Sequence, residues 1–472
     1  MIGLHGRSGA RFRRAVEARF FRRRRGKGIS PHSHGLRNWG ERVGFCLVRT
    51  SVEIRPFRGY ISTVFQRHIQ PALQEALAED PVVFLRGPRQ SGKTTLVKAL
   101  QTGPQARQYR TLDDLATLSA ARSDPVAFVS AIKGPVTIDE VQRVPELLLA
   151  IKQRVDEDRT PGRFLLTGSA EVRVGGAVAE SLAGRMRVLD LWPLSQSEIE
   201  GTGGDLLEGF WDGSIVSSFK SGIEKQGLIH RMLRGGFPEA VTRKTVAGAQ
   251  RWLQSYADAL IERDMTDLAR IGDVSNMRRL LALAGSRTGT VVNYADFARI
   301  LGVPLTTVRR YVALAQAVFF SFEIPAWAGN TSARLVRQPK LHLSDPGIAC
   351  VLTGVDDRSC ESQAIFLGQL FETFVVSEIR KAITWSPLML SLSHFRSHAG
   401  REVDAVLESR DGSVCGIEMK FGATIRSEDF GGLRYLREVA GSKFRGGYVL
   451  YSGDSVVSVA PDLQALPVSV LW

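Results

Sequence analysis

The stretch of sequence that decides the fold is Gly87-Pro88-Arg89-Gln90-Ser91-Gly92-Lys93-Thr94, which follows the apolar run 82–85. The pattern G-x-x-x-x-G-K-[ST] between a strand and a helix is typical of a loop that binds nucleotide phosphates. Its glycines allow backbone conformations in which successive N–H groups point at phosphate oxygens. The expected helix 95–100 adds partial positive charge at its N-terminus. We therefore predict that residues 87–95, Thr95 included, bind a nucleotide, with Lys93 at the β/γ-phosphates and Thr94 on Mg²⁺.

A second segment completes this predicted site 46 residues further along the chain. Val136-Thr137-Ile138-Asp139-Glu140 is an apolar run that ends in two acids. Asp139 would hold Mg²⁺ through water, and Glu140 would polarise the attacking water. A third apolar run, 163–166, ends in Thr167-Gly168-Ser169, so Thr167 or Ser169 would sense the γ-phosphate. Adenine is the expected base, because the chain has no N-K-x-D motif.

Arg185 is a candidate arginine finger. Such a cation stabilises transition-state charge, supplied in cis or in trans by a neighbouring subunit. In trans it would require a ring or a dimer, so the chain is a candidate homo-oligomer. An arginine at a helix end that is simply solvated is the alternative.

Strands that alternate with helices predict an α/β fold with a parallel sheet. We expect helices over 60–79 and 144–155, and strands over 82–85, 135–138 and 163–166. Residues 196–226 are rich in Gly and Ser and read as a loop or lid, and 228–325 read as helical. After Pro339 we expect strands over 403–408, 414–420 and 447–451 around a helix over 367–383.

Composition limits the class of protein. The chain has 472 residues, 44% of them hydrophobic, which is enough for several domains with buried cores. Its apolar runs are too short to span a bilayer, and its four cysteines (Cys46, Cys350, Cys360 and Cys415) are too few and scattered for a disulfide framework. We expect a cytoplasmic protein without a membrane partner.

The net charge of +14 is concentrated at the N-terminus. Residues 1–58 carry fourteen Arg and one Lys against three acids, a net charge of +12. Charge this dense opposes a packed core, so we expect a disordered Arg-rich tail. It would be a nucleic-acid-binding arm, a targeting sequence, or an over-extended translation start. The remainder is nearly neutral and gives no electrostatic argument for DNA.

These motifs together resemble the prokaryotic AAA-type P-loop ATPases that carry a C-terminal domain of unknown function. The resemblance includes Ser181-Leu182-Ala183-Gly184-Arg185, Gly235-Gly236-Phe237-Pro238, Ile261-Glu262-Arg263-Asp264, and Pro339-Lys340 followed by Ser344-Asp345-Pro346-Gly347. It covers roughly residues 60–455. It implies an AAA-like nucleotide domain, a winged-helix-like middle and a PD-(D/E)xK nuclease-like end. The domains we expect are 1–58 (tail), 59–200 (ATPase, three-layer), 201–260 (lid and linker helices), 261–335 (winged-helix-like) and 336–472 (nuclease-like).

Residues 293–320 read as a helix–turn–helix. Two helices, 294–301 and 305–314, flank the turn Gly302-Val303-Pro304. Side chains of the second helix would contact DNA phosphates or base edges in a major groove. Such helices also serve as packing or partner surfaces, and that alternative stays open. The candidate DNA contacts are Thr306, Thr307, Arg309 and Arg310.

The C-terminal part holds carboxylates in a nuclease-like spacing. Glu418 and Lys420 lie two residues apart on an expected strand and so share a face, and a hairpin would bring Asp404 beside them. Glu372 on helix 367–383 would complete a Mg²⁺-binding site that acts on a phosphodiester. The leading Pro of the PD-(D/E)xK pattern is absent, since Val403 precedes Asp404, and residues 333–472 hold 15 basic and 16 acidic groups. A retained fold that does not cleave is therefore the alternative.

Three hypotheses follow from the sequence. The primary one is a Mg²⁺-dependent ATPase whose cycle drives conformational change on nucleic acid. The second is an ATP-gated DNA nuclease that uses the C-terminal carboxylates. The third is a regulator in which ATP switches a DNA- or protein-binding surface without cleavage.

Overall fold

The computed structural model describes residues 65–101, 106–169, 182–203, 206–213, 219–265, 274–329, 338–397 and 400–472. The chain divides into Met1–Ile61 and a compact unit, Ser62–Trp472. The predicted Arg-rich tail lies outside the described residues. None of the described helices combines the length and the apolar character needed to cross a bilayer.

A five-stranded parallel sheet carries the phosphate-binding motif. Its strand order is β2-β3-β4-β1-β5. The order is not sequential, because β1 lies between β4 and β5. Since β3, β4 and β1 are parallel neighbours, the loops that follow them lie at the same edge of the sheet. This confirms the predicted α/β fold with a parallel sheet. The strands are β1 (Val82–Arg86), β2 (Gln108–Thr111), β3 (Val136–Asp139), β4 (Phe164–Gly168) and β5 (Met186–Asp190).

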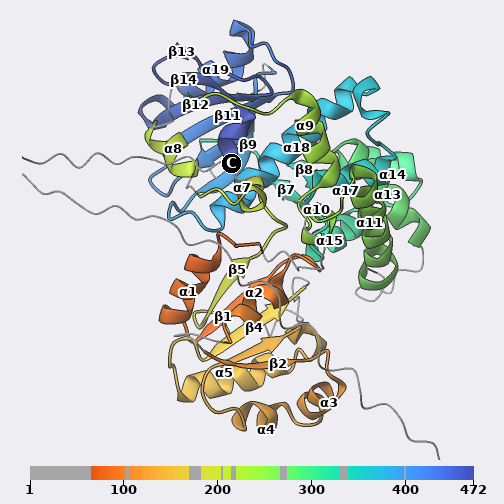
Figure 1. Cartoon of the computed structure of the whole chain (residues 1–472), viewed down its shortest axis with the longest axis vertical. Coiled ribbons are helices and arrows are strands. Elements are labelled where there is room, and N and C mark those ends of the chain that lie inside the picture. The colour runs from red at the N-terminus through yellow and green to blue at the C-terminus, as the bar shows by residue number, and fades with distance from the viewer. Residues whose placement is uncertain are drawn as a thin grey trace, which may run out of the picture. The chain divides into compact units, whose positions relative to one another are not determined.

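Helices cover both faces of this sheet (Figure 1). Alternation along β1 sends Val82 and Phe84 to one face and Val83 and Leu85 to the other, and all four are buried. Each buried side chain of this size contributes about 1.5–3 kcal/mol relative to exposure. The helices are α1 (Gln70–Glu79) and α2 (Lys93–Ala99) on one face, and α3 (Leu115–Ser123), α4 (Pro125–Ser130) and α5 (Leu147–Glu157) on the other.

Two helices begin later than the sequence predicted. Helix α1 starts at Gln70 rather than at residue 60, and Pro71 lies in its first turn. Proline fits there because its fixed φ suits a helix and its missing N–H would have no partner in that turn. Helix α5 starts at Leu147, after a short 3₁₀ turn at Val141–Arg143.

The segment predicted as a loop or lid contains helices. Helix α7 (Gln196–Glu200) begins in a capping box, in which the Ser195 hydroxyl accepts from the Glu198 N–H and the Glu198 carboxylate accepts from the Ser195 N–H. Helix α8 (Leu206–Asp212) follows it. The Ser-x-x-Glu pattern at 195–198 is a helix-start signal that outweighs the nearby glycines.

A helical region follows, as expected, with a small sheet that the sequence did not predict. The sheet is antiparallel with the order β6-β8-β7, formed by Thr290–Val291, Lys340–Leu343 and Ser321–Ile324. The two predicted helices of the helix–turn–helix are present, the second extended to Ala317. The helices are α9 (Lys225–Arg234), α10 (Pro238–Val241), α11 (Val246–Ala259), α13 (Val274–Ser286), α14 (Tyr294–Leu301), α15 (Leu305–Ala317) and α17 (Pro346–Thr353).

A buried carboxylate joins two distant motifs of this region. The Gly236 N–H donates to Asp345 Oδ2 over 2.7 Å, and Asp345 Oδ1 accepts from the Gly347 N–H over 2.9 Å at the start of α17. Asp345 therefore caps a helix and fixes the turn at Gly235-Gly236. In the described part of the chain, the motifs at 235–238 and 344–347 are thus joined by hydrogen bonds that stabilise the fold.

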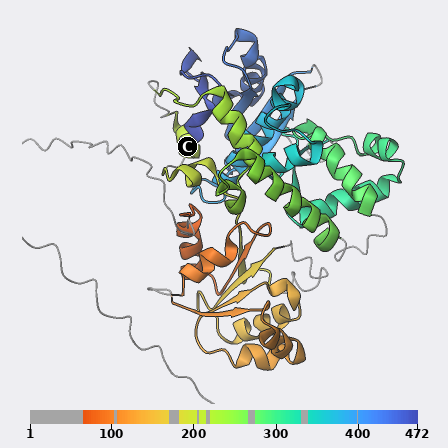
Figure 2. The ribbon, with the colours of Figure 1, turned by 45° about the vertical axis from the view of Figure 1, so that its right-hand side comes forward.

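The C-terminal domain is a six-stranded mixed sheet with the order β13-β14-β12-β11-β10-β9. Helix α18 (Ala364–Ile383) packs on one face and α19 (Gly431–Ala440) on the other, as Figure 2 shows in blue tones. The predicted strands and helix are present, with 414–420 unchanged and the others extended at one end. The strands are β9 (Ser391–Arg396), β10 (Glu402–Glu408), β11 (Val414–Lys420), β12 (Phe444–Tyr451), β13 (Val457–Ala460) and β14 (Leu463–Pro467).

Candidate nucleotide-binding site

The loop between β1 and α2 has the backbone that a phosphate cradle needs. Gly87 has φ +155° and Gly92 has φ +97°. A Cβ at Gly87 would lie 2.1 Å from the Leu191 carbonyl oxygen, so only glycine fits there. Gln90 also has a positive φ of 60°. This left-handed conformation is uncommon for a residue with a Cβ, and it occurs often at functional sites.

Lys93 lies buried inside this loop. Its Nζ donates to the carbonyl oxygens of Gly87 (2.9 Å) and Pro88 (2.7 Å). Burial lowers the pKa of Lys93 to about 8, although the charges of Glu140 and Asp139 act in the opposite direction. The ammonium group is thus held at the centre of the loop, where it can exchange carbonyl oxygens for phosphate oxygens.

Asp139 gathers three hydroxyl groups at the end of β3. Thr94 Oγ1 donates to Asp139 Oδ2 over 2.9 Å, and the Tyr109 hydroxyl donates to the same oxygen over 2.6 Å. Thr167 Oγ1 donates to Asp139 Oδ1. The structure therefore brings both predicted Mg²⁺ ligands together. Their hydroxyl and carboxylate oxygens are hard ligands of the kind that Mg²⁺ prefers, and so the residues fit that ion.

Glu140 has a strained backbone and a fixed carboxylate. Its φ of 61° is in the left-handed region, and its N–H donates to Thr167 Oγ1 over 3.1 Å. Glu140 Oε2 accepts from Gln142 Nε2 and, over 3.4 Å, from Ser169 Oγ. The ends of β3 and β4 are thus joined by hydrogen bonds, with Glu140 beside both Thr167 and Ser169.

Two residues that support the site were not predicted from the sequence. Arg67, in the turn before α1, donates to the Ser91 carbonyl oxygen (2.7 Å) and the Trp192 carbonyl oxygen (2.7 Å). Its Nε pairs with Glu198 Oε1 over 3.0 Å, and both side chains are buried. Arg67 and Tyr109 lie outside the motifs, and local sequence gives no signal for either.

Arg185 lies far from the loop of its own chain. Val82 of β1 pairs with Met186 of β5, so Arg185 precedes its strand at the opposite end of the sheet from Gly87. Five strand residues at ~3.3 Å each separate the two ends by about 17 Å. Arg185 Nε pairs instead with Asp156 Oδ1 over 2.6 Å. Arg185 is therefore out of reach of its own phosphate loop in this structure, and its action as an arginine finger stays a prediction.

The candidate DNA contacts share one helix. Thr306, Arg309 and Arg310 are exposed near the N-terminus of α15, and Thr307 is half-buried. The interleaved Val308, Tyr311 and Val312 are buried and hold the helix in place. The surface of α15 thus presents two cationic side chains and two hydroxyl groups.

The C-terminal candidates also come together. Asp404 on β10 accepts from the Met419 N–H of β11 over 3.0 Å, and Lys420 Nζ pairs with Glu418 Oε1 over 3.0 Å. Burial, followed by the charge of Asp404, raises the pKa of Glu372 well above its ordinary value. The same two causes raise the pKa of Glu418 to about 8. The four predicted residues therefore form one cluster between α18 and the sheet.

The cluster also contains Lys340, which the sequence did not predict as part of it. Lys340 Nζ of β8 donates to Glu372 Oε1 (2.7 Å) and Asp404 Oδ1 (2.9 Å). Burial opposes its charge, but Asp404 and Glu372 raise its pKa overall. Within the described residues no group of three or more His, Cys, Asp or Glu side chains has a metal-binding arrangement. The cluster as it stands does not fit a divalent cation.

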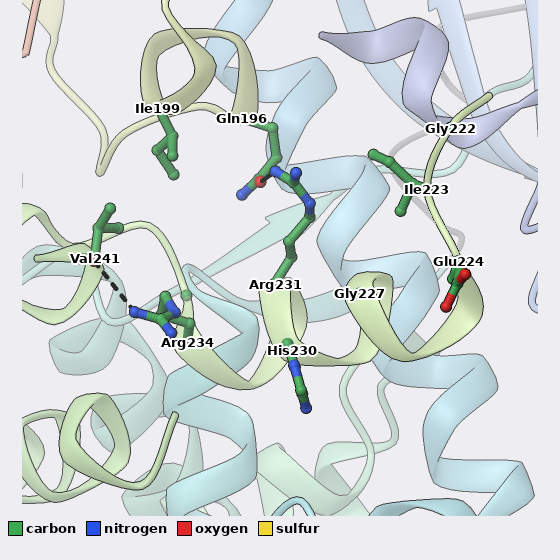
Figure 3. A pocket seen from close by; sticks show the side chains of 11 residues that line it. Gln196, Ile199, Gly222, Ile223, Glu224, Gly227, His230, Arg231, Arg234 and Val241 are labelled. Atoms are coloured by element: carbon green, nitrogen blue, oxygen red, sulfur yellow. Dashed lines mark hydrogen bonds between the residues drawn. The ribbon is translucent and has the colours of Figure 1, made fainter. Parts of the chain in front are cut away.

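A separate cavity of about 500 Å³ lies along α9 (Figure 3). The side chains of Arg231 and Gln196 point toward each other there, with Arg231 Nη1 2.8 Å from Gln196 Oε1 and Nη2 2.6 Å from Glu200 Oε1. Arg234 donates to the Val241 carbonyl oxygen over 3.3 Å. Both arginines already bind protein oxygens, and we assign no ligand to this cavity.

Comparison with known proteins places this geometry in a family. The model of an AAA domain matches residues 79–200, which contain the sheet and the loop described above. An uncharacterised protein of Mycobacterium tuberculosis and one of Mycobacterium bovis are each 30% identical to this chain over 361 residues. The match covers 76% of this chain and 74% of each relative. The chain belongs to the AAA-type P-loop ATPase family.

Further family models match later parts of the chain. Two domains of unknown function match residues 225–359 (DUF8612) and 367–471 (DUF4143). Among solved structures, a Walker-type ATPase of Pyrococcus abyssi is 17% identical, with coverage of 64% of this chain and 99% of that one and a TM-score of 0.37. A RuvB variant of Thermotoga maritima is 19% identical, with coverage of 54% and 89% and a TM-score of 0.26.

Proposed function

We propose that this protein is a Mg²⁺-dependent ATPase. The observation that carries the proposal is the contact of Thr94 with Asp139 beside Lys93, at the edge where β1, β3 and β4 end. These are the groups that hold the β/γ-phosphates and the metal ion in P-loop enzymes. The chain thus supplies one continuous site for a nucleoside triphosphate and its cation.

Each residue has a role in this proposal. Lys93 and the loop N–H groups of residues 87–95, apart from Pro88, would bind the phosphates, while Thr94, and Asp139 through water, would hold a Mg²⁺ ion that neutralises developing negative charge. Glu140 accepts a proton from, or orients, the attacking water. Thr167 is hydrogen-bonded to Glu140 and Asp139, and Ser169 is hydrogen-bonded to Glu140. Both hydroxyl groups would sense the γ-phosphate. Preorganisation of these groups is the main source of catalysis in such sites.

We further propose that the ATP cycle changes the conformation of the remaining regions. The Tyr256 hydroxyl of α11 donates to the Arg89 carbonyl oxygen of the phosphate loop over 3.2 Å. The Gln196 N–H at the start of α7 donates to Glu378 Oε2 of α18 over 2.7 Å. Loop movements on nucleotide binding would therefore reach both the helical region and the C-terminal domain. We propose that nucleic acid binds to α15 and that this movement acts on it.

The first experiment measures ATP hydrolysis with and without DNA. Wild type should hydrolyse ATP only with Mg²⁺, and Lys93→Ala should reduce the rate at least 100-fold. Lys152→Ala is the matched control, because Lys152 is a partly exposed α5 lysine paired with Asp156. An unchanged rate in Lys93→Ala, with the protein folded, would falsify the proposal. DNA that does not alter the rate would remove its nucleic-acid part.

A second candidate is a regulator in which ATP switches a DNA- or protein-binding surface without cleavage. The partly polar surface of α15 and the near-neutral C-terminal domain favour it over an ATP-gated nuclease. Plasmid incubated with Mg²⁺ and ATP, wild type beside Asp404→Ala, separates the two. Nicking by wild type that Asp404→Ala loses would favour the nuclease, and DNA-stimulated turnover with intact plasmid would favour the regulator.

A further inference from the structure

The buried Lys340 connects two regions of the chain. It lies on β8, whose partners β6 and β7 belong to the small sheet of the helical region. Its ammonium group binds Glu372 on α18 and Asp404 on β10 of the C-terminal domain. Only 5% of its side chain is exposed. A buried ammonium group with two carboxylate partners at hydrogen-bond distance is a complete ionic site.

Four carboxylate oxygens of the cluster already have protein partners, whereas the buried Glu418 Oε2 has none among the described residues. Asp404 uses Oδ1 for Lys340 and Oδ2 for the Met419 N–H, and Glu418 Oε1 pairs with Lys420. Mg²⁺ requires six ligands at 2.0–2.1 Å in octahedral geometry. An ion that bound both Glu372 Oε1 and Asp404 Oδ1 would compete with the Lys340 ammonium group for these two oxygens.

We propose that Lys340 is the resident cation of the C-terminal carboxylate cluster, and that this cluster holds no divalent metal and does not cleave nucleic acid. Lys340 neutralises Glu372 and Asp404 and joins β8 to the C-terminal domain. The cluster is a fixed ionic connection between two regions. A catalytic site would instead leave its carboxylates free for a metal ion and a water molecule.

Metal binding to full-length protein without nucleotide tests the proposal. Mn²⁺ alone serves as the probe, with free Mn²⁺ measured by electron paramagnetic resonance. Wild type and Asp404→Asn should bind Mn²⁺ equally, because Asp404 is not a metal ligand in wild type. Lys340→Met should gain a site at least tenfold tighter than any in wild type, and Lys340→Met combined with Asp404→Asn should lose it.

Lys420→Met is the matched control. It removes a lysine of the same cluster that pairs with Glu418, and it leaves Lys340 in place, so it should gain no site. Two outcomes overturn the proposal. One is wild-type Mn²⁺ binding that Asp404→Asn abolishes, and the other is a folded Lys340→Met protein that gains no site.

A measurement on wild type alone keeps the proposal testable if the Lys340 variants do not fold. Fe²⁺ placed at a Mg²⁺ site reduces added hydrogen peroxide to hydroxide and a hydroxyl radical that cuts the backbone nearby, and added ascorbate returns the Fe³⁺ to Fe²⁺. With ATP bound we expect cuts near Asp139 and none near Glu372, Asp404 or Glu418. Cuts at the C-terminal cluster would overturn the proposal, whereas missing cuts at Asp139 would count only against the ATPase site.

Discussion

Lys93 is a buried cation of the phosphate loop, and its burial disfavours the charged form. Its ammonium group is bound by two loop carbonyl oxygens and is buried with Asp139, Glu140 and Arg89 as charged neighbours. Burial lowers its pKa from 10.5 to about 8, so the free protein loses this charge at moderately alkaline pH. Bound phosphates favour the charged form. Nucleotide affinity should therefore depend on pH.

We predict that ATP affinity falls as pH rises above about 8, by roughly tenfold per pH unit until the pKa of the bound state is reached. Above pH 8 the Lys93 amine is neutral in the free protein but protonated in the complex. Binding therefore takes up a proton, and a higher pH weakens it. Titration calorimetry in buffers of different ionisation enthalpy measures that proton. Lys93→Met should show no uptake and Lys152→Ala should show it in full. An affinity that is flat from pH 7.5 to 9.5 would contradict the prediction.

Arg67 provides a second prediction at this scale. Replacing it with Ala leaves the Glu198 carboxylate buried without its cation, and breaking a buried pair costs about 3–5 kcal/mol. We expect a loss of that size in the free energy of unfolding by urea, together with weaker ATP binding, because Ser91 loses its support. Combining Arg67→Met with Glu198→Gln should recover part of the stability. A loss below about 1 kcal/mol would show that water replaces the pair.

At the scale of elements, α15 has the surface that the nucleic-acid proposal needs. Arg309 and Arg310 are exposed on the helix that follows the turn at Gly302-Val303-Pro304. Hydrophobic periodicity and Gly302 predicted this pair of helices well, because both signals are local. The strands β6, β7 and β8 were not predicted, since they are short and pair with segments distant in sequence.

We predict that Arg309→Ala combined with Arg310→Ala weakens DNA binding and lowers the slope of log affinity against log salt by about 2, because each phosphate contact releases about one counterion. Fluorescence anisotropy over a salt series measures both quantities. The control pair, Arg426→Ala with Arg434→Ala, removes two arginines from the C-terminal domain and should change neither. Equal effects of the two pairs would show that α15 is only a packing surface.

At the scale of the whole molecule, Arg185 bears on assembly. It lies at the far end of the sheet from its own phosphate loop and pairs with Asp156. If it acts in catalysis, it must act on a neighbouring copy. An assembly of this chain would then place the amino-terminal edge of one sheet near the loop of the next.

We predict that Arg185→Ala and Lys93→Ala are each inactive alone but recover part of the ATPase rate when mixed, because each supplies what the other lacks. Mixed assemblies with one intact site should recover up to about one quarter of the wild-type rate in a dimer. Asp156→Asn, which frees Arg185, should stay active. An active Arg185→Ala protein would show that this arginine is only a surface ion pair.

Local sequence was enough to predict the phosphate loop, the strand that ends in Asp139-Glu140 and the parallel α/β sheet. Those features are encoded by adjacent residues, because a glycine-rich turn, a helix start and a strand period all act over a few positions. Other contacts became visible only in the folded chain. Arg67 meets Glu198 131 residues away, and Lys340 meets Asp404 64 residues away. These contacts depend on how distant elements pack, and local sequence carries no signal for that packing. The acids of the C-terminal part were predicted as a metal site because the ion pairs of Lys340 with Glu372 and Asp404 depend on this packing.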